Sequence, residues 1–151
     1  MQKQNLTITY GDTVFNGFNF EALPLPAALQ VAVQQIDLTA DQARASVVGD
    51  ALRVVEYEMA ESEATAFQAA GFEGEVPLTV QATVDAEGVT PQQAAESILS
   101  EAATWRTALC QIRAARLKGK QTVLKAGSHA EAEVMADSAI NAIRASVPGV
   151  V

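Results

Sequence analysis

Cysteine, histidine and tryptophan each occur only once in these 151 residues, and aromatic residues amount to 5% of the chain. A single cysteine, Cys110, excludes an internal disulfide, fits a reducing compartment and leaves no cysteine pair to hold zinc. Cys110 falls within an expected helix, so we expect a packed or inert thiol rather than a nucleophile. The one histidine, His129, falls in the first turn of another expected helix and is interpreted as a surface residue rather than a catalytic base.

Long hydrophobic runs are also absent. No run approaches the roughly 18 residues of a membrane span, and the N-terminal MQKQNLTITYG lacks the apolar core of a signal peptide. We therefore expect a protein that is made and kept in a cytoplasm and has no membrane partner. Hydrophobic residues make up 49% of the sequence, but 29 positions are alanine. This composition favours closely packed helices and leaves room for partner chains to supply further burial.

Positive charge is scarce and unevenly distributed. The formal net charge of −8 opposes nonspecific contact with phosphate backbones, so nucleic acid is not an expected partner. Residues 37–101 hold 13 acidic residues and two arginines, whereas residues 102–127 hold six basic residues and no acidic one. These segments form either a solvated surface with cations near a helix end, or pairs between long helices, within a subunit or between neighbours.

Patterns that carry chemistry are few. Four glutamates lie close together, at Glu56, Glu58, Glu61 and Glu63, but no histidine shares their helix and their side chains spread around it, so they are interpreted as a solvated face. The stretch at residues 119–122 only superficially resembles a phosphate-binding loop, because its first glycine is absent and it follows a helix. We expect a protein without catalytic, cofactor-binding or metal-binding residues, and hence not an enzyme.

Residues 1–25 are predicted to form a β-hairpin. Leu6, Ile8 and Tyr10 alternate with threonines, residues 11 and 12 offer a turn, and residues 13–20 supply a second apolar run. Two strands alone are marginal in water, so the hairpin needs either helices behind it or another chain beside it. We interpret it as a docking element that can be removed while residues 39–145 hold the fold. Its candidate partner-binding residues are Tyr10, Phe15, Phe18 and Phe20.

The remaining residues, 26–151, are predicted to form a helical domain. Pro26 suits the start of a short helix over residues 27–35. A capping box at Thr39 and Gln42 then predicts one long helix that ends at Gly71 and continues through Gly49, at a cost of about 1 kcal/mol relative to alanine. Its expected buried stripe consists of Val48, Leu52, Val55, Met59, Ser62 and Ala66.

The segment from residue 90 to 120, TPQQAAESILSEAATWRTALCQIRAARLKGK, has the clearest helical pattern. Thr90 and Gln93 form a capping box around Pro91, which suits the first helical position. Beyond this start, apolar residues recur at alternating spacings of four and three, at Ile98, Ala102, Trp105, Leu109 and Ile112, and are expected to be buried. Trp105 is expected to be a core anchor; an exposed contact for a partner is the alternative.

This segment resembles a recurrent C-terminal pattern in small virion proteins of tailed bacteriophages, found in tail, baseplate and tail-fibre-associated proteins. The matching residues are Ala95, Ile98, Leu99, Trp105, Ala108, Leu109, Ile112, Arg113, Arg116, Leu117, Gly119 and Lys120. The resemblance extends at most over residues 76–145. It implies a structural, non-enzymatic virion component in the tail, baseplate or tail-fibre attachment region, made in the bacterial host cytoplasm.

Such a component would act by contacts with other virion proteins, as a homo- or hetero-oligomer. The alternative is a soluble phage assembly factor or chaperone that is absent from the mature particle; an enzyme or an unrelated helical scaffold is a third possibility. If the hairpin is not the docking site, the basic face around Arg113 and Arg116 is the next candidate for partner binding.

Two further segments complete the prediction of a mainly α fold. Residues 76–88 alternate as a strand does, yet Pro77 and Gly88 bracket them as a short helix, and the resemblance slightly favours the helix. Ser128 and Glu131 form a third capping box, for a helix that runs to about Ala145 before Pro148 and Gly149. Its expected buried stripe is Ala132, Ala136, Ala139 and Ile143, so the C-terminal half is predicted to be a helical hairpin.

Overall fold

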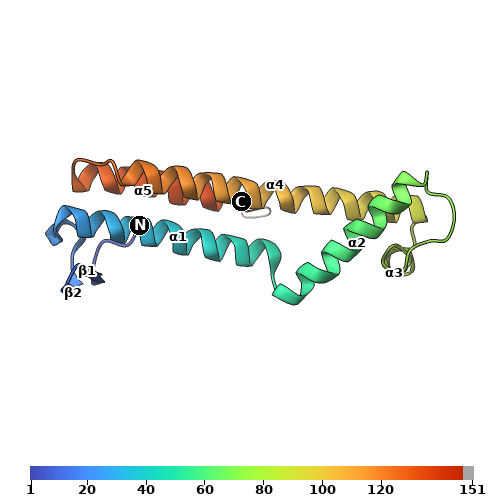
Figure 1. The fold of residues 1–151 in the computed structure, drawn as a ribbon, viewed down its shortest axis with the longest axis horizontal. Coiled ribbons are helices and arrows are strands. Elements are labelled where there is room, and N and C mark those ends of the chain that lie inside the picture. Colours follow the sequence, from blue (N-terminus) through green and yellow to red (C-terminus); the bar gives the residue numbers. More distant parts are fainter. Residues whose placement is uncertain (148–151) are drawn as a thin grey trace. The chain divides into compact units, whose positions relative to one another are not determined.

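Helices account for most of the chain, which confirms the predicted fold class. The computed structural model describes residues 1–147, except for the side chains of residues 51 and 52. Its elements are β1 (Leu6–Tyr10), β2 (Thr13–Phe18), a single 3-10 turn η1 (Phe20–Ala22), α1 (Leu25–Val48), α2 (Ala51–Ala69), α3 (Leu78–Glu87), α4 (Pro91–Val123) and α5 (His129–Ala145) (Figure 1).

The chain divides into two compact units. The first unit combines residues 1–47 with the described residues from 108 onward, and the second unit comprises residues 48–107. The helix α4 contributes its first half to the second unit and its second half to the first. Within the sequence, the division therefore falls near Gly49 and in the middle of α4, while the hairpin belongs to the first unit.

The core of the first unit is formed by α1, the second half of α4, and α5, which lie side by side (Figure 1). Nine of its twenty buried residues are alanines. Because an alanine side chain is a single methyl group, the helices must approach closely to leave no voids. The larger fully buried side chains are Phe20, Ile36, Ile112, Val123 and Ile143. All four residues of the predicted stripe on α5 are buried, which confirms this part of the prediction.

Gly119 marks the closest approach of the helices in the first unit. It is buried in the interior of α4, and a methyl group placed on it would overlap the side chain of Ala139 on α5 and lie 3.5 Å from Cδ1 of Ile36 on α1. The missing side chain therefore lets three helices meet at one point. Glycine is unfavourable inside a helix, and here close packing offsets that cost.

The hairpin packs one face against this core. Strands β1 and β2 are antiparallel, and Leu6 lies opposite Phe18 while Ile8 lies opposite Phe15. Residues directly opposite share a face of the sheet, so these four side chains lie on the face that buries Leu6 and Ile8. The opposite face carries Thr7 and Asn16, whose side chains are joined by a hydrogen bond of 2.8 Å. The helices behind the hairpin thus stabilise its two strands.

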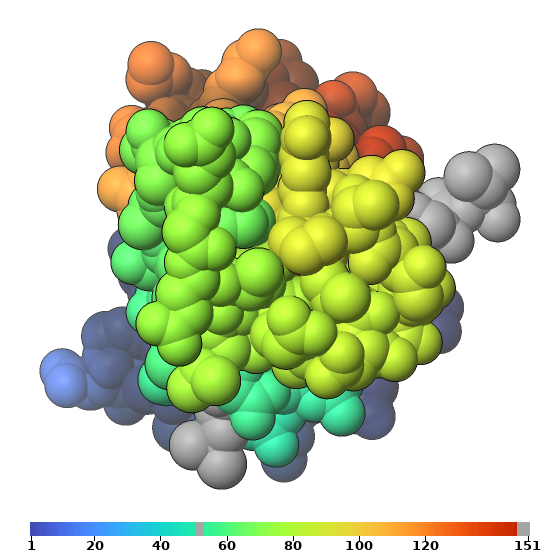
Figure 2. Space-filling model, turned by 90° about the vertical axis from the view of Figure 1, so that its right-hand side faces the viewer, coloured from blue at the N-terminus to red at the C-terminus, as the bar shows by residue number. Residues whose placement is uncertain are grey.

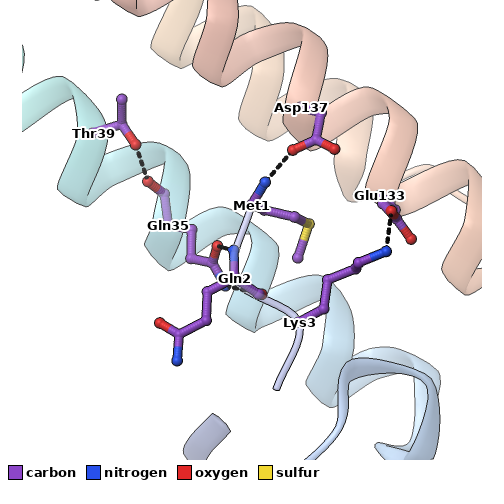
Figure 3. Close-up of polar contacts among 7 residues, drawn as sticks. All are labelled: Met1, Gln2, Lys3, Gln35, Thr39, Glu133 and Asp137. Carbon is purple, nitrogen blue, oxygen red and sulfur yellow. Dashed lines mark hydrogen bonds and ion pairs between the residues drawn. The ribbon is translucent and has the colours of Figure 1, made fainter. Parts of the chain in front are cut away.

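The residues before β1 tie α1 to α5 (Figure 3). The backbone N–H of Gln2 donates to Oε1 of Gln35 on α1 at 2.7 Å, and Nε2 of Gln35 donates back to the Gln2 carbonyl at 2.8 Å. On the other side, the Lys3 ammonium contacts the Glu133 carboxylate on α5 at 2.7 Å. The hydrogen bond and negative charge of Glu133 raise the pKa of Lys3 above its ordinary value. The N-terminal residues are therefore part of the first unit's packing.

The helix α1 is longer than predicted. The expected boundary between residues 35 and 39 is wrong, because α1 continues through it without interruption. Thr39 lies in the helix interior, where its hydroxyl donates to the carbonyl of Gln35 at 2.8 Å instead of capping a helix start. A threonine hydroxyl can make this bond inside a helix as well as cap a helix start, so a capping pair alone does not fix a helix boundary. No glycine or proline lies between Leu29 and Thr39 to end the helix.

The predicted long helix is broken at Gly49. This residue has φ of +68°, a left-handed conformation that glycine adopts without strain and that commonly ends helices. The next residue, Asp50, is of a type preferred at helix starts, and its carbonyl accepts a hydrogen bond from the N–H of Arg53 at 3.1 Å. Gly49 therefore ends α1, and Asp50 precedes the start of α2. The sequence predicts one helix from the capping box at Thr39 and the apolar spacing, despite the cost of Gly49, with a local break there as the alternative; the structure shows the break.

The predicted buried stripe on α2 is also wrong. Val55 is 64% exposed and Met59 is 51% exposed, while Ala64 and Phe67 are buried instead. The predicted stripe continues the helical spacing through Gly49, but α1 ends there and α2 is a separate helix, so the spacing does not carry over. The side chain of Leu52, another predicted member, lies outside the described part of the structure. The predicted end near Gly71 is confirmed, since α2 ends at Ala69.

Other helix boundaries agree with the sequence. The slightly favoured helix over residues 76–88 is confirmed as α3. At the start of α4, the N–H of Thr90 donates to Oε1 of Gln93 at 3.0 Å and the N–H of Gln93 donates to the Thr90 hydroxyl at 3.3 Å, as in a capping box. At α5 the N–H of Glu131 donates to Ser128 at 3.2 Å. The predicted stop at Pro148 and Gly149 lies outside the described residues.

We expect the Phe20→Ala variant to lose about 3 to 5 kcal/mol of unfolding free energy, because Phe20 is fully buried in the first unit's core. The matched control is Phe18→Ala, which removes the same side chain from a position that is 39% exposed and should cost less than about 1 kcal/mol. Urea denaturation followed by circular dichroism measures both. Equal losses would contradict the packing of η1 into the core.

A second expectation concerns Gly119. Gly119→Ala should lower the unfolding free energy by up to about 2 kcal/mol, because overlap with Ala139 outweighs the roughly 1 kcal/mol that alanine gains inside a helix. Combining it with Ala139→Gly removes the overlapping methyl group. The double variant should therefore lose less stability than the two single variants together, and strict additivity would argue against a direct contact.

Candidate docking groove

A concave surface of about 470 Å³ lies between α2, α3 and the first half of α4, within the second unit. Its apolar wall includes Tyr57 and Met59 from α2 and Ile98 and Trp105 from α4. We call this surface the groove. Its volume lies in the range of protein binding sites, and side chains of this kind are enriched where proteins bind one another.

An aromatic pair forms part of the groove wall. The rings of Tyr57 and Trp105 meet edge to face with centroids 3.9 Å apart. Trp105 is half-buried, as are Ile98 and Leu109, whereas Ala102 and Ile112 are fully buried. The expectation that Trp105 is a buried core anchor is therefore only partly correct. Trp105 packs against Tyr57 and lines the groove, so its position is intermediate between the two alternatives drawn from the sequence.

Glu63 holds α3 in position beside the groove. Its Oε2 accepts hydrogen bonds from the Thr79 hydroxyl at 2.7 Å and from the Thr79 N–H at 3.0 Å. The N–H groups in the first turn of a helix lack partners within the helix, so a carboxylate from α2 here caps α3. The two hydrogen bonds, from the hydroxyl first and the backbone second, lower the pKa of Glu63 below its ordinary value.

A small apolar core lies beneath the groove. Ala64 and Phe67 of α2, Val80 of α3, and Ala94 and Ala95 of α4 are its fully buried members. Figure 2 shows these segments, in green to yellow, packed against one another on the face turned to the viewer. The three helices of the second unit are thus joined by burial as well as by the Glu63 cap.

The second unit carries the chain's negative charge. Residues 48–107 contain 11 acidic and two basic residues, a net charge of −9, while the rest of the chain contains seven acidic and eight basic residues, a net charge of +1. Glu56 and Glu101 line the groove itself. Glu61 is paired with Arg106 at 2.5 Å. Among the described residues, Glu56 and Glu101 have no ion-pair partner.

The aromatic docking residues expected on the hairpin do not form a free surface. Phe20 is fully buried, with its ring edge to face against His129 at 5.7 Å, so it cannot contact a partner from this position. Phe15 and Phe18 contact each other at 5.4 Å on the face that turns to the core. Only Tyr10 and Phe18 retain substantial exposure, 41% and 39%. Leu6 and Ile8 are buried in the core of the first unit, so the hairpin is packed against the helices, and a docking role is left to the exposed parts of Tyr10 and Phe18.

The two candidate arginines on α4 differ in their surroundings. Arg116 is ion-paired with Asp37 of α1 at 3.3 Å, and Lys120 contacts the same carboxylate at 2.6 Å. Arg113 is exposed and has no ion pair within the described residues. The acidic and basic segments therefore pair within the chain at Asp37, which is one of the alternatives drawn from the sequence. Arg113 is left without an ion pair among the described residues.

The single histidine is less exposed than a surface residue, and the single cysteine is not packed. His129 is half-buried, and its Nε2 lies 2.9 Å from the carbonyl oxygen of Leu23, which links the start of α5 to the segment after η1. Cys110 is exposed rather than packed. The part of the chain that the structure describes contains no cluster of three or more potential metal ligands.

Sequence reasoning did not find the groove. Met59 was assigned to a buried stripe, and α3, which supplies one wall, was ambiguous between strand and helix. The feature of the sequence that could have indicated the groove is Trp105, which lies on a helix next to an acidic segment.

Comparisons with protein-family models, curated proteins and solved structures found no match. Among the described helices, none combines the length and apolar character needed to cross a membrane.

We expect Glu63→Ala to weaken the docking of α3 by about 1 kcal/mol, the usual value of a lost helix cap. Because the folded pKa of Glu63 is lowered, its contribution is present above the ordinary pKa of 4.5 and is lost as the pH falls through the lowered value. Hydrogen exchange of the α3 amides should therefore be faster in the variant at pH 7, with the difference shrinking in acid. Glu58→Ala, which removes an exposed carboxylate, is the control, and a difference independent of pH would refute the cap.

Proposed function

We propose that this chain is a structural, non-enzymatic component of a tailed-phage virion, in the tail, baseplate or tail-fibre attachment region, and that it acts through protein–protein contacts made by the groove. The proposed role in protein–protein contacts rests on the groove. It presents a half-buried tryptophan, an exposed methionine and two carboxylates on one concave surface. Large aromatic side chains of this kind contribute most of the binding energy in protein interfaces.

The virion setting rests on the resemblance of residues 95–120 to small virion proteins, and all twelve matching residues lie on α4. Four of them, Ala95, Ala108, Ile112 and Gly119, are buried and serve helix packing. Others are accessible, including Trp105 and Ile98 in the groove wall and the exposed Arg113. The resemblance therefore combines residues that hold α4 in place with residues that a partner can reach.

A soluble phage assembly factor or chaperone is the second candidate. The exposed side chain of Met59 favours it, because flexible methionine side chains adapt to more than one partner. Both functions use the groove, and they differ in whether the protein stays in the finished particle. Mass spectrometry of purified particles distinguishes them: a stoichiometric amount supports the structural component, and its absence from particles supports the assembly factor.

The groove is tested by Met59→Glu, which places a charge on its apolar wall beside Glu56 and Glu101. Incorporation into particles, quantified by mass spectrometry, should fall by at least about tenfold, equivalent to 1.4 kcal/mol of lost binding. Val55→Glu adds the same charge to another exposed apolar position on α2, outside the groove, and should incorporate normally. Normal incorporation of Met59→Glu would exclude the groove as the contact site; for an assembly factor, the yield of intact particles replaces incorporation as the readout.

A further inference from the structure

A second surface, with positive rather than negative charge beside its apolar residues, lies on the second half of α4. Leu117 and Leu124 are each 43% exposed. Arg113, Leu117 and Leu124 fall within about 40° of one another around a helix of 3.6 residues per turn. The backbone N–H of Leu124 still donates to the carbonyl of Lys120 at 3.1 Å, so the helical direction continues to that residue. Lys118 lies about 100° to 140° from these three residues around the helix, at the margin of this surface. We call Arg113, Leu117, Lys118 and Leu124 the basic leucine face.

The cations of this face are available for a partner. Arg113 and Lys118 are exposed, and neither has an ion pair among the described residues. Their neighbours Arg116 and Lys120 are already neutralised by Asp37. The two exposed leucines are seven residues apart, the spacing at which one side of a helix binds an apolar groove. The face is therefore an amphipathic helix surface with free positive charge at its margin.

We infer that the groove of one copy binds the basic leucine face of a second copy. This inference rests on the proposed role of the groove as a contact site and names its occupant. The apolar wall with Met59 and Trp105 is suited to contact the exposed leucines. The carboxylates of Glu56 and Glu101 are opposite in charge to Arg113 and Lys118. The unit that holds the groove has a net charge of −9, which favours a basic partner over an acidic one. Both complementary surfaces are present on every copy of the chain.

The contact is tested by charge reversal and mixing. In the E56K/E101K variant both surfaces are basic, and in the R113E/K118E variant both are acidic, so each variant alone should be monomeric. A mixture restores opposite charges at both kinds of contact and should associate again. Sedimentation velocity measures this against the monomer mass of 15.9 kDa. All four replaced side chains are exposed, and circular dichroism verifies that the variants fold.

The apolar part of the contact has its own variant. L117S/L124S should raise the dissociation constant by at least about tenfold, while Leu38→Ser, which replaces a leucine that is 57% exposed on α1, should not change it. Raising the salt concentration should weaken association of the wild-type chain, because charge pairs at an interface margin are screened.

Two results would overturn the inference. One is a wild-type chain that stays monomeric at high concentration in low salt, and the other is a mixture of the two charge-reversal variants that stays monomeric although the wild type associates. Either result leaves the proposed function standing if Met59→Glu still prevents incorporation into particles, because the groove would then bind a different virion protein. Normal incorporation of Met59→Glu, by contrast, would remove the premise itself.

Discussion

The first unit depends on the close contact between α4 and α5 at Gly119. An alanine-rich core has little volume to fill, so its stability requires the helices to approach closely within the first unit. At Gly119, the absence of a side chain allows Ala139 and Ile36 to approach the backbone of α4. That approach also brings Asp37 of α1 within reach of Arg116 and Lys120. The close approach of α1, α4 and α5 at Gly119 therefore accounts for both the burial and the ion pairing on this side of α4.

The same close packing accounts for the N-terminal hairpin. A two-stranded sheet is marginal by itself, and the helices of the first unit supply the apolar surface that Leu6, Ile8 and Phe20 require. Of the four aromatic residues near the N-terminus, Phe20 and Phe15 are thereby used inside the molecule, while Tyr10 and Phe18 retain substantial exposure. The two surfaces that we propose as contact sites lie elsewhere, in the groove of the second unit and on the exposed side of the second half of α4.

Charge follows the same division between the units. Nearly all cations of the chain belong to the first unit, and the second unit has a large excess of carboxylates. Inside the first unit, Asp37 neutralises two of these cations, and the exposed Arg113 and Lys118 are left over. In the second unit, Glu63 caps α3 and Glu61 pairs with Arg106, while Glu56 and Glu101 remain beside the groove. The structure thus separates charges that are paired within the chain from the unpaired charges on which the proposed contacts depend.

The sequence by itself determined the features that depend on neighbouring residues. The hairpin, the starts of α4 and α5, and the buried stripe of α5 follow from alternation, capping residues and helical spacing, which act over a few positions along the chain. The tertiary structure alone decided the continuity of α1 through Thr39, the inward direction of Phe20, and the groove around Trp105. These depend on which surfaces meet across long stretches of sequence, and a buried stripe and a groove wall have the same apolar spacing until the packing partner is known.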